Sequence, residues 1–259
     1  MSVDGIDHII ELPEDPLGGS AGAKMFHVLF AGKTSSEQFP YIVFNEKVAG
    51  EICRMLGLYC PEVLLEQFND KWYFFSHWQE TTPQNTILPP GSSQDISNFF
   101  QKEQGYVHGM IIFDLFVGNN DRRRDNILLR SRDGNLALID HGNSLLYYPS
   151  SNSSVASGVE RLDQLRADLR VMFDKPHQFL WALTDMALVE SWIRKIRQIP
   201  DYFIESMISN LPEMEYVDLE MKEKTIAFLK DRRTYLWDHI MTHRELFPNL
   251  KERKRDDIQ

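Results

Sequence analysis

Residues 113–144 read FDLFVGNNDRRRDNILLRSRDGNLALIDHGNS, and this stretch decides the fold of the 259-residue chain. It contains an Asp121-x4-Asn126 spacing and ends on Asp140, followed by His and Gly. Its two short apolar runs are separated by an Arg-Asp-Gly-Asn turn signal, which predicts a β-hairpin. Such a hairpin would bring Asn126 and Asp140 together at one end.

Acid and amide side chains are crowded around this predicted hairpin. Asn120, Asp121, Asp125 and Asn126 precede the first strand, and Asp140 returns beside them. Asp and Asn at strand ends are often only turn formers, which leaves a purely structural hairpin as the alternative. Clustered carboxylates, however, are costly unless a cation lies between them. A carboxylate that positions and deprotonates a hydroxyl, with an amide oxygen and a second carboxylate for magnesium, suits phosphoryl transfer from ATP.

The motifs of this stretch resemble those of kinases. Ordinary protein kinases carry His-Arg-Asp-x4-Asn and then Asp-Phe-Gly, whereas this chain has Asn119-Asn120-Asp121 and Asp140-His141-Gly142. It is more similar to the HipA-like Ser/Thr kinases and, more distantly, to phosphatidylinositol kinases. An upstream segment, FNEKVA at 44–49 leading to RMLGLYCP at 54–61, also resembles HipA-like kinases. The resemblance spans residues 24 to 145.

This resemblance implies an α+β, two-lobed protein-kinase-like fold. A small β-rich N-lobe would span residues 1–82, and a larger, mainly helical C-lobe residues 83–259. The implied cofactors are ATP and Mg²⁺, and the implied reaction transfers the γ-phosphate to a Ser or Thr hydroxyl of a protein. The serine-rich segment 150–157 is a ready acceptor for self-modification. A pseudokinase or nucleotide-binding module and a phosphatidylinositol-type lipid kinase remain the alternatives.

Three roles follow from the kinase motifs. Asp121, in a catalytic loop at 118–126, would be the base. Asn126 and Asp140, the latter in a metal motif at 140–142, would hold Mg²⁺. One of the three following arginines, Arg122, Arg123 and Arg124, with Arg122 and Arg124 as the candidates, would stabilise the transferring phosphoryl group. Alternatively, these are surface arginines that neutralise Asp121 and Asp125.

The phosphate-binding lysine is harder to assign. In HipA-like kinases it lies within a strand, and the equivalent run at 25–31 has Leu29 at that position. Lys24, before the predicted strand, and Lys33, after it, are the candidates. Glu46 would pair with the lysine, or would only be a helix N-terminal acid favoured by the dipole.

A glycine-rich segment precedes this strand. Gly19, Ser20 and Gly22 could cradle phosphates through backbone N–H groups, or could belong to a linker.

Composition indicates which classes of partner and which compartment to expect. The net charge of −10 argues against a protein that binds nucleic-acid backbone. No apolar run is long enough to span a membrane, and the acidic N-terminus is unlike a secretory signal. The two cysteines, Cys53 and Cys60, indicate free thiols of a reducing compartment. We therefore expect a cytoplasmic protein, and the resemblance to HipA-like kinases implies a protein substrate.

Periodicity predicts the remaining elements. We expect helices at 45–58 and 105–117, and a hairpin of strands 62–67 and 71–78. A loop is expected at 147–159, and mainly helices from 162 onward.

Overall fold

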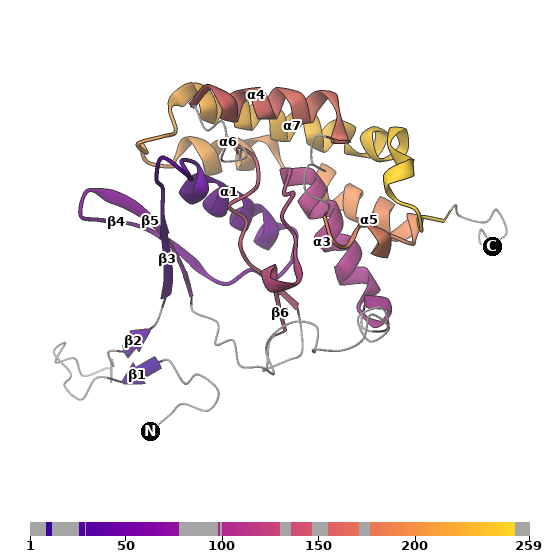
Figure 1. Cartoon of the computed structure of the whole chain (residues 1–259), viewed down its shortest axis with the longest axis horizontal. Coiled ribbons are helices and arrows are strands. Elements are labelled where there is room, and N and C mark those ends of the chain that lie inside the picture. The colour runs from indigo at the N-terminus through magenta and orange to yellow at the C-terminus, as the bar shows by residue number, and fades with distance from the viewer. Residues whose placement is uncertain are drawn as a thin grey trace.

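The computed structural model describes residues 9–11, 26–28, 30–77, 98, 100–129, 136–146, 155–170 and 177–251. The N-terminal part is built on antiparallel strands (Figure 1). Strands β3 (Phe30–Thr34), β5 (Lys71–His77) and β4 (Val63–Phe68) form a sheet in that order, and β1 (Ile9–Glu11) pairs separately with β2 (Phe26–Val28). The predicted hairpin β4–β5 is confirmed.

The turn of that hairpin has the backbone that its sequence favours. Asn69 and Asp70 both have positive φ, 50° and 60°. Asn and Asp tolerate this left-handed conformation, and two such residues match the twist of the flanking strands.

The expected strand at 25–31 is wrong in its extent. The segment contributes to β2 and β3, and β3 continues to Thr34, so that Lys33 lies inside a strand and not after it. Ala31 ends the apolar run, but the strand goes on because Lys33 is paired with Phe74 and Thr34 with Tyr73 of β5. Pairing with β5, and not local hydrophobicity, sets the end of β3.

Helix α1 (Ile42–Met55) packs against this sheet and begins three residues before the predicted start. Val48, Ala49 and Ile52 are fully buried on it. They join one hydrophobic core that continues into the C-terminal helices. Cys53 at the end of α1 and Cys60 beyond it are buried free thiols, as the sequence predicts.

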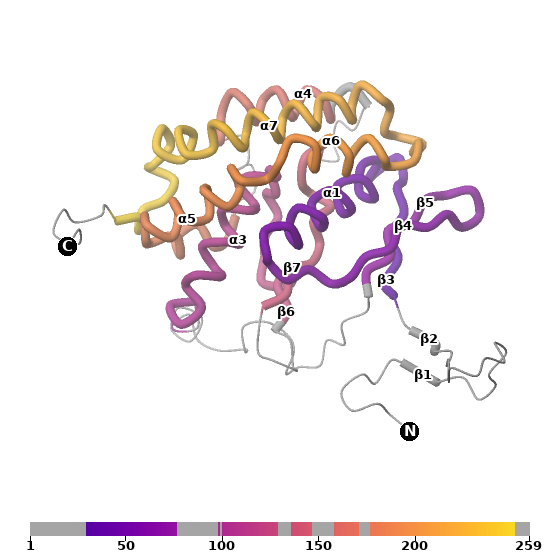
Figure 2. Tube along the Cα trace, turned by 180° about the vertical axis from the view of Figure 1, so that it is seen from behind, coloured from indigo at the N-terminus to yellow at the C-terminus, as the bar shows by residue number. Residues whose placement is uncertain are grey.

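The C-terminal part is mainly helical (Figures 1 and 2). Its helices are α3 (Gln104–Val117), α4 (Val155–Ala167), α5 (Met186–Arg197), α6 (Asp201–Ser209) and α7 (Leu219–Thr242), with short 3-10 turns η1 (Arg124–Asn126), η3 (Leu180–Ala182) and η4 (Arg244–Leu246). Helix α4 starts at Val155, inside the loop expected at 147–159, so that expectation is wrong for its second part. None of the helices in the described ranges is long and apolar enough to cross a bilayer.

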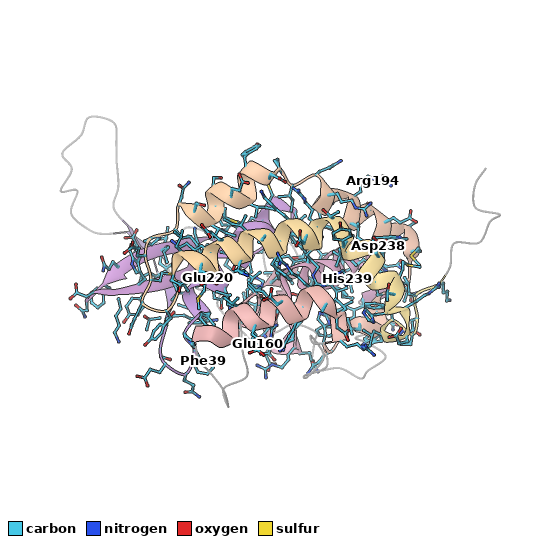
Figure 3. The ribbon with its side chains drawn as sticks, turned by 90° about the horizontal axis from the view of Figure 1, so that it is seen from above. Phe39, Glu160, Arg194, Glu220, Asp238 and His239 are labelled. Carbon is cyan, nitrogen blue, oxygen red and sulfur yellow. The ribbon has the colours of Figure 1, made fainter. Side chains whose placement is uncertain are left out.

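Helix α3 is the centre of this region. Residues 107–117 are all buried, and α5 packs along the helix. Gly109 permits the close approach of α5, because a Cβ there would lie 2.3 Å from the Trp192 ring. Gly118, with φ of 70°, ends α3 in the left-handed conformation that favours glycine. Helices α4 and α7 lie side by side over this layer (Figure 3).

A second hairpin connects the two parts. Strand β6 (Ile127–Leu129) pairs antiparallel with β7 (Leu136–Leu138), as the sequence predicts. The amide of Leu138 donates to the Tyr59 carbonyl at 2.9 Å, which ties β7 to the segment after α1. The expected lobe boundary at residues 82 and 83 falls outside the described ranges.

Candidate active site

A lysine and two carboxylates from three distant elements meet at the junction of the sheet and the β6–β7 hairpin. Lys33 of β3 forms an ion pair with Glu46 of α1. The same ammonium contacts Oδ1 of Asp140, just after β7, at 2.9 Å. Glu46 is 2% exposed, whereas the Lys33 and Asp140 side chains are 34% and 39% exposed. The cluster therefore combines a buried carboxylate, Glu46, with two side chains that solvent can reach, Lys33 and Asp140.

The charges of this cluster stabilise one another. Burial lowers the pKa of Lys33, but the two carboxylates outweigh burial and raise it above its usual value. Burial raises the pKa of Asp140, and the Lys33 ammonium outweighs that effect, so the net shift is downward. Lys33 and Asp140 are thus held in their charged forms.

Helix α1 also fixes the backbone around Asp140. The Glu46 carboxylate accepts from the His141 amide at 2.9 Å, and the Asn45 side chain donates to the Gly142 carbonyl at 2.9 Å. Asp140 has φ of 57°, a left-handed conformation that aspartate tolerates better than most residues. Glu46 lies more than one turn into α1, which begins at Ile42, so its interpretation as a helix N-terminal acid is wrong.

Asp121 follows the end of α3 and is held from both sides. Its amide donates to Oδ1 of Asn119 at 3.1 Å. Its Oδ2 accepts from the Asn143 side chain at 2.8 Å, and its Oδ1 lies 3.1 Å from Nε of Arg123. The Asp121 side chain is 15% exposed. A preoriented, partly exposed carboxylate suits contact with a hydroxyl of a bound molecule.

The residues present fit a Mg²⁺ ion. Asn126 donates through Nδ2 to the Asp121 carbonyl at 2.7 Å, and in the described part of the chain no donor contacts its Oδ1. Oδ2 of Asp140 likewise lacks a donor there. Mg²⁺ commonly takes one or two protein oxygens and completes its shell with water and phosphate. A pair of oxygens such as these is enough, although no group of three His, Cys, Asp or Glu side chains among the described residues has metal-binding geometry.

Arg122 lies neither at the proposed phosphate site nor on the surface, the two positions that the sequence suggested. It is completely buried, and its guanidinium is paired with Asp114 of α3, whose nearest oxygen is 2.9 Å from Nε. Neither the phosphate-contacting nor the surface-exposed interpretation fits, because every N–H of the guanidinium already has an acceptor within the protein. Arg123, by contrast, is 49% exposed and does neutralise Asp121.

The other predicted residues divide into two groups. Arg124 is half-buried in η1, and its amide donates to the Gln178 side chain at 3.4 Å. The other predicted positions lie outside the described residues. They are Gly19, Ser20 and Gly22 of the glycine-rich segment, the second candidate lysine Lys24, Leu29, and residues 150–154 of the serine-rich segment.

Several residues of the site were not predicted from the sequence. Asn45 could have been found, because it immediately precedes Glu46 in the matched segment. Asn143 also directly follows the 140–142 motif. Asp114, which pairs with Arg122, and His177, whose Nε2 lies 3.1 Å from Oδ2 of Asp114, carried no signal. An acid in an apolar helix and a lone histidine far downstream have no motif around them.

Comparisons with known proteins concern the family and the fold of the chain. Residues 62–158 match the family model described as phosphatidylinositol 3- and 4-kinase. The fold is similar to the crystal structure of the Helicobacter pylori proinflammatory kinase CtkA, with a TM-score of 0.56 and 20% identity over 83% of this chain and 90% of that one. Shewanella oneidensis HipA, in a complex with HipB and operator DNA, aligns over 96% of this chain and 67% of that one, with a TM-score of 0.47 and 11% identity.

No curated protein matches the sequence significantly. The segment with the kinase-family match contains Asp121, Asn126 and Asp140, and it lies within a chain similar in fold to CtkA. The predicted fold class is therefore confirmed: the protein has an α+β, kinase-like fold. Asp121, Asn126 and Asp140 of the candidate site lie in the segment that matches the phosphatidylinositol 3- and 4-kinase model, whereas Lys33 and Glu46 lie before that segment.

Proposed function

We propose that the protein is an ATP- and Mg²⁺-dependent phosphotransferase that acts on a Ser or Thr hydroxyl of a protein, in the manner of HipA-like kinases. The observation that carries this proposal is the cluster of Lys33, Glu46 and Asp140. Three elements separated by up to 107 positions converge to place one ammonium between two carboxylates. A lysine fixed by a helix glutamate, beside a metal-binding aspartate, is the arrangement that kinases use to hold ATP phosphates.

Each residue then has a chemical task. The Lys33 ammonium would contact the ATP phosphates, with Glu46 keeping it in place. Asn126 and Asp140 would hold Mg²⁺, which when bound neutralises charge on the phosphates. The Asp121 carboxylate would orient the acceptor hydroxyl and accept its proton, while the Asn143 amide holds that carboxylate in position.

The position of Lys33 bears on the pseudokinase alternative. Leu29 favours that alternative, because the sequence pattern of HipA-like kinases has a lysine at this position. Because β3 extends to Thr34, Lys33 supplies a strand lysine that reaches Glu46. The chain therefore retains a base, a lysine and two metal ligands, which supports activity.

A lipid hydroxyl is the second candidate acceptor. The family model over residues 62–158 favours it by its description. The net charge of −10 weighs against it, because anionic membrane surfaces attract basic proteins. We therefore place a protein acceptor first.

The test is incubation of the purified chain with γ-labelled ATP and Mg²⁺. One reaction contains a generic protein acceptor, one contains phosphatidylinositol vesicles, and one contains the chain alone, followed by phosphosite mapping. Label on Ser or Thr, including the 150–157 segment, supports the proposal, whereas label on lipid alone would replace it with the second candidate. Label in no reaction, together with no nucleotide binding, would refute both.

A further inference from the structure

Arg122 is a buried residue of the catalytic loop that touches neither solvent nor the open side of the site. Its guanidinium has five N–H groups, and each has an acceptor. Nε and Nη2 bind the two oxygens of Asp114 at 2.9 and 3.0 Å. Nη1 donates to the carbonyls of Asn126 and Ile139, both at 2.8 Å, and Nη2 also lies 3.1 Å from Nδ1 of His141.

The three acceptors other than Asp114 lie at the two proposed metal ligands. One is the carbonyl of Asn126 itself. The other two belong to Ile139 and His141, which precede and follow Asp140. A single rigid side chain thus connects the backbone of one proposed metal ligand with both neighbours of the other. Because the guanidinium is planar, it sets the distance and angle between these two segments.

Asp114 is itself fixed by further donors. Its Oδ1 accepts from the Asn119 side chain at 2.9 Å, and its Oδ2 accepts from Nε2 of His177 at 3.1 Å. The Phe179 amide donates to Nδ1 of His177 at 3.3 Å, so the proton of the neutral ring lies on Nε2, where it faces Asp114. Burial raises the pKa of Asp114, but Arg122 and His177 outweigh burial and hold it well below its usual range.

We propose that Arg122, anchored by Asp114 and His177, is a positioning residue that sets the geometry of the Mg²⁺ site formed by Asn126 and Asp140. The inference rests on the proposed function, because it assigns these two residues to the metal. His177 lies beyond the segment that matches the kinase family model, so part of this support comes from outside that segment.

Lysine cannot replace arginine here. Its single ammonium has three donors at one point, and it cannot span Asp114 and two separate carbonyls. Arg122→Lys therefore keeps the charge opposite Asp114 but removes the guanidinium donor from the carbonyls of Asn126 and Ile139, and the Asn126 carbonyl then keeps only the Ile139 amide at 3.1 Å. The loss should appear in the metal site. Groups that support metal ligands typically contribute about 10- to 100-fold to metal affinity or activity.

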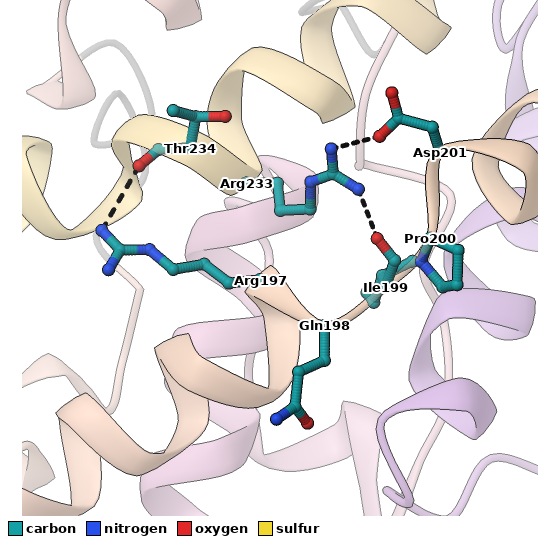
Figure 4. Close-up of a pocket in the computed structure, with 7 residues that line it drawn as sticks. All are labelled: Arg197, Gln198, Ile199, Pro200, Asp201, Arg233 and Thr234. Atoms are coloured by element: carbon teal, nitrogen blue, oxygen red, sulfur yellow. Dashed lines mark hydrogen bonds and ion pairs between the residues drawn. The ribbon is translucent and has the colours of Figure 1, made fainter.

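The experiment compares wild type, Arg122→Lys and a control, Arg197→Lys. Arg197 is exposed and lies in a pocket of about 530 Å³ between α5, α6 and α7, where it donates to the Thr234 carbonyl at 3.4 Å (Figure 4). Two quantities are measured: the Mg²⁺ concentration for half-maximal ATP binding, and the exchange rates of the Ile139, His141 and Ile193 amides by NMR.

We expect Arg122→Lys to raise the half-saturating Mg²⁺ concentration at least about 10-fold. Exchange should accelerate at Ile139 and His141 but not at Ile193 in α5, and the control should change neither quantity. Uniform acceleration at all three amides with unchanged Mg²⁺ dependence would show that Arg122 only stabilises the fold, and would overturn the proposal. If Arg122→Lys does not fold, the double variant Asp114→Leu/Arg122→Met, which removes both buried charges together, takes its place in the same measurements.

The proposed function can fail independently. If wild type binds no Mg-ATP, the assignment of the site is wrong, and the exchange rates alone decide the positioning role. Acceleration confined to Ile139 and His141 would still support it, and unchanged rates there would overturn it.

Discussion

Replacing Lys33 with Met removes the only cation that contacts both Glu46 and Asp140 among the described residues. Glu46 is 2% exposed, and its remaining hydrogen-bond partner among the described residues is the His141 amide at 2.9 Å. Breaking a fully buried ion pair costs about 3–5 kcal/mol. Because Lys33 is 34% exposed and water can reach the site, we discount this to about 2 kcal/mol of unfolding free energy at pH 7.

Glu46→Gln tests whether the two residues act as one unit. The glutamine keeps an oxygen for the His141 amide but loses the charge opposite Lys33. Once Lys33 is absent, neutralising Glu46 removes an uncompensated buried charge. The double variant should therefore be no less stable than the worse single variant, with a coupling free energy of about 1–2 kcal/mol.

The assay is urea denaturation of wild type, both single variants and the double variant, with Mg-ATP affinity measured on the same four proteins. Lys47→Met is the matched control, because this neighbouring lysine pairs at 2.7 Å with Glu51 one turn along α1, and the Glu51 side chain is 31% exposed, not buried like Glu46. It should cost less than about 0.5 kcal/mol. Additive single effects, or a Lys33 variant no less stable than the Lys47 variant, would refute the coupled cluster.

Three further predictions follow from the same contacts. Asp121→Ala should keep ATP affinity and lower the rate of phosphoryl transfer about 10²- to 10⁴-fold, and a collapse of ATP affinity would reassign its role. The stability difference between wild type and Lys33→Met should be constant from about pH 5 to 10. It should shrink as the pH falls below the ordinary Asp pKa of about 3.9 and through the lowered pKa of Asp140, and as the pH rises above the ordinary Lys pKa of about 10.4 and through the raised pKa of Lys33. Urea midpoints across this range check it. Gly109→Ala should lower the unfolding free energy by about 1–3 kcal/mol because its Cβ overlaps the Trp192 ring, whereas Gly105→Ala, with open space around its Cβ, should not destabilise the chain.

Much of the centre of the site could be predicted from sequence, because its signals are local. The β6–β7 hairpin follows from two apolar runs and one turn, and it brings Asn126 near Asp140. The α1 segment was recognised by its Asn-Glu pair. Its contacts with the metal motif at His141 and Gly142 could not be predicted, since they join residues 95 and 97 positions apart.

The failures have physical causes. The end of β3 was misplaced because cross-strand pairing with β5, and not the apolar run, carries the strand through Lys33. Arg122 was misassigned because three consecutive arginines look alike in sequence, whereas only the fold reveals that one of them is buried opposite Asp114. A buried acid inside the apolar helix α3 gives no periodic signal of its partner.

The most direct test of the central claim is the effect of Mg-ATP on the unfolding of wild type and Asp140→Asn. A ligand at a hundred times its dissociation constant stabilises a protein by about 2.7 kcal/mol. We predict that wild type gains stability of this order with Mg-ATP, and less with ATP and a chelator. Asp140→Asn should remain folded and gain nothing from Mg²⁺. Equal Mg-ATP stabilisation of the two proteins, or none in wild type at millimolar nucleotide, would contradict the assignment of this cluster as a nucleotide and metal site.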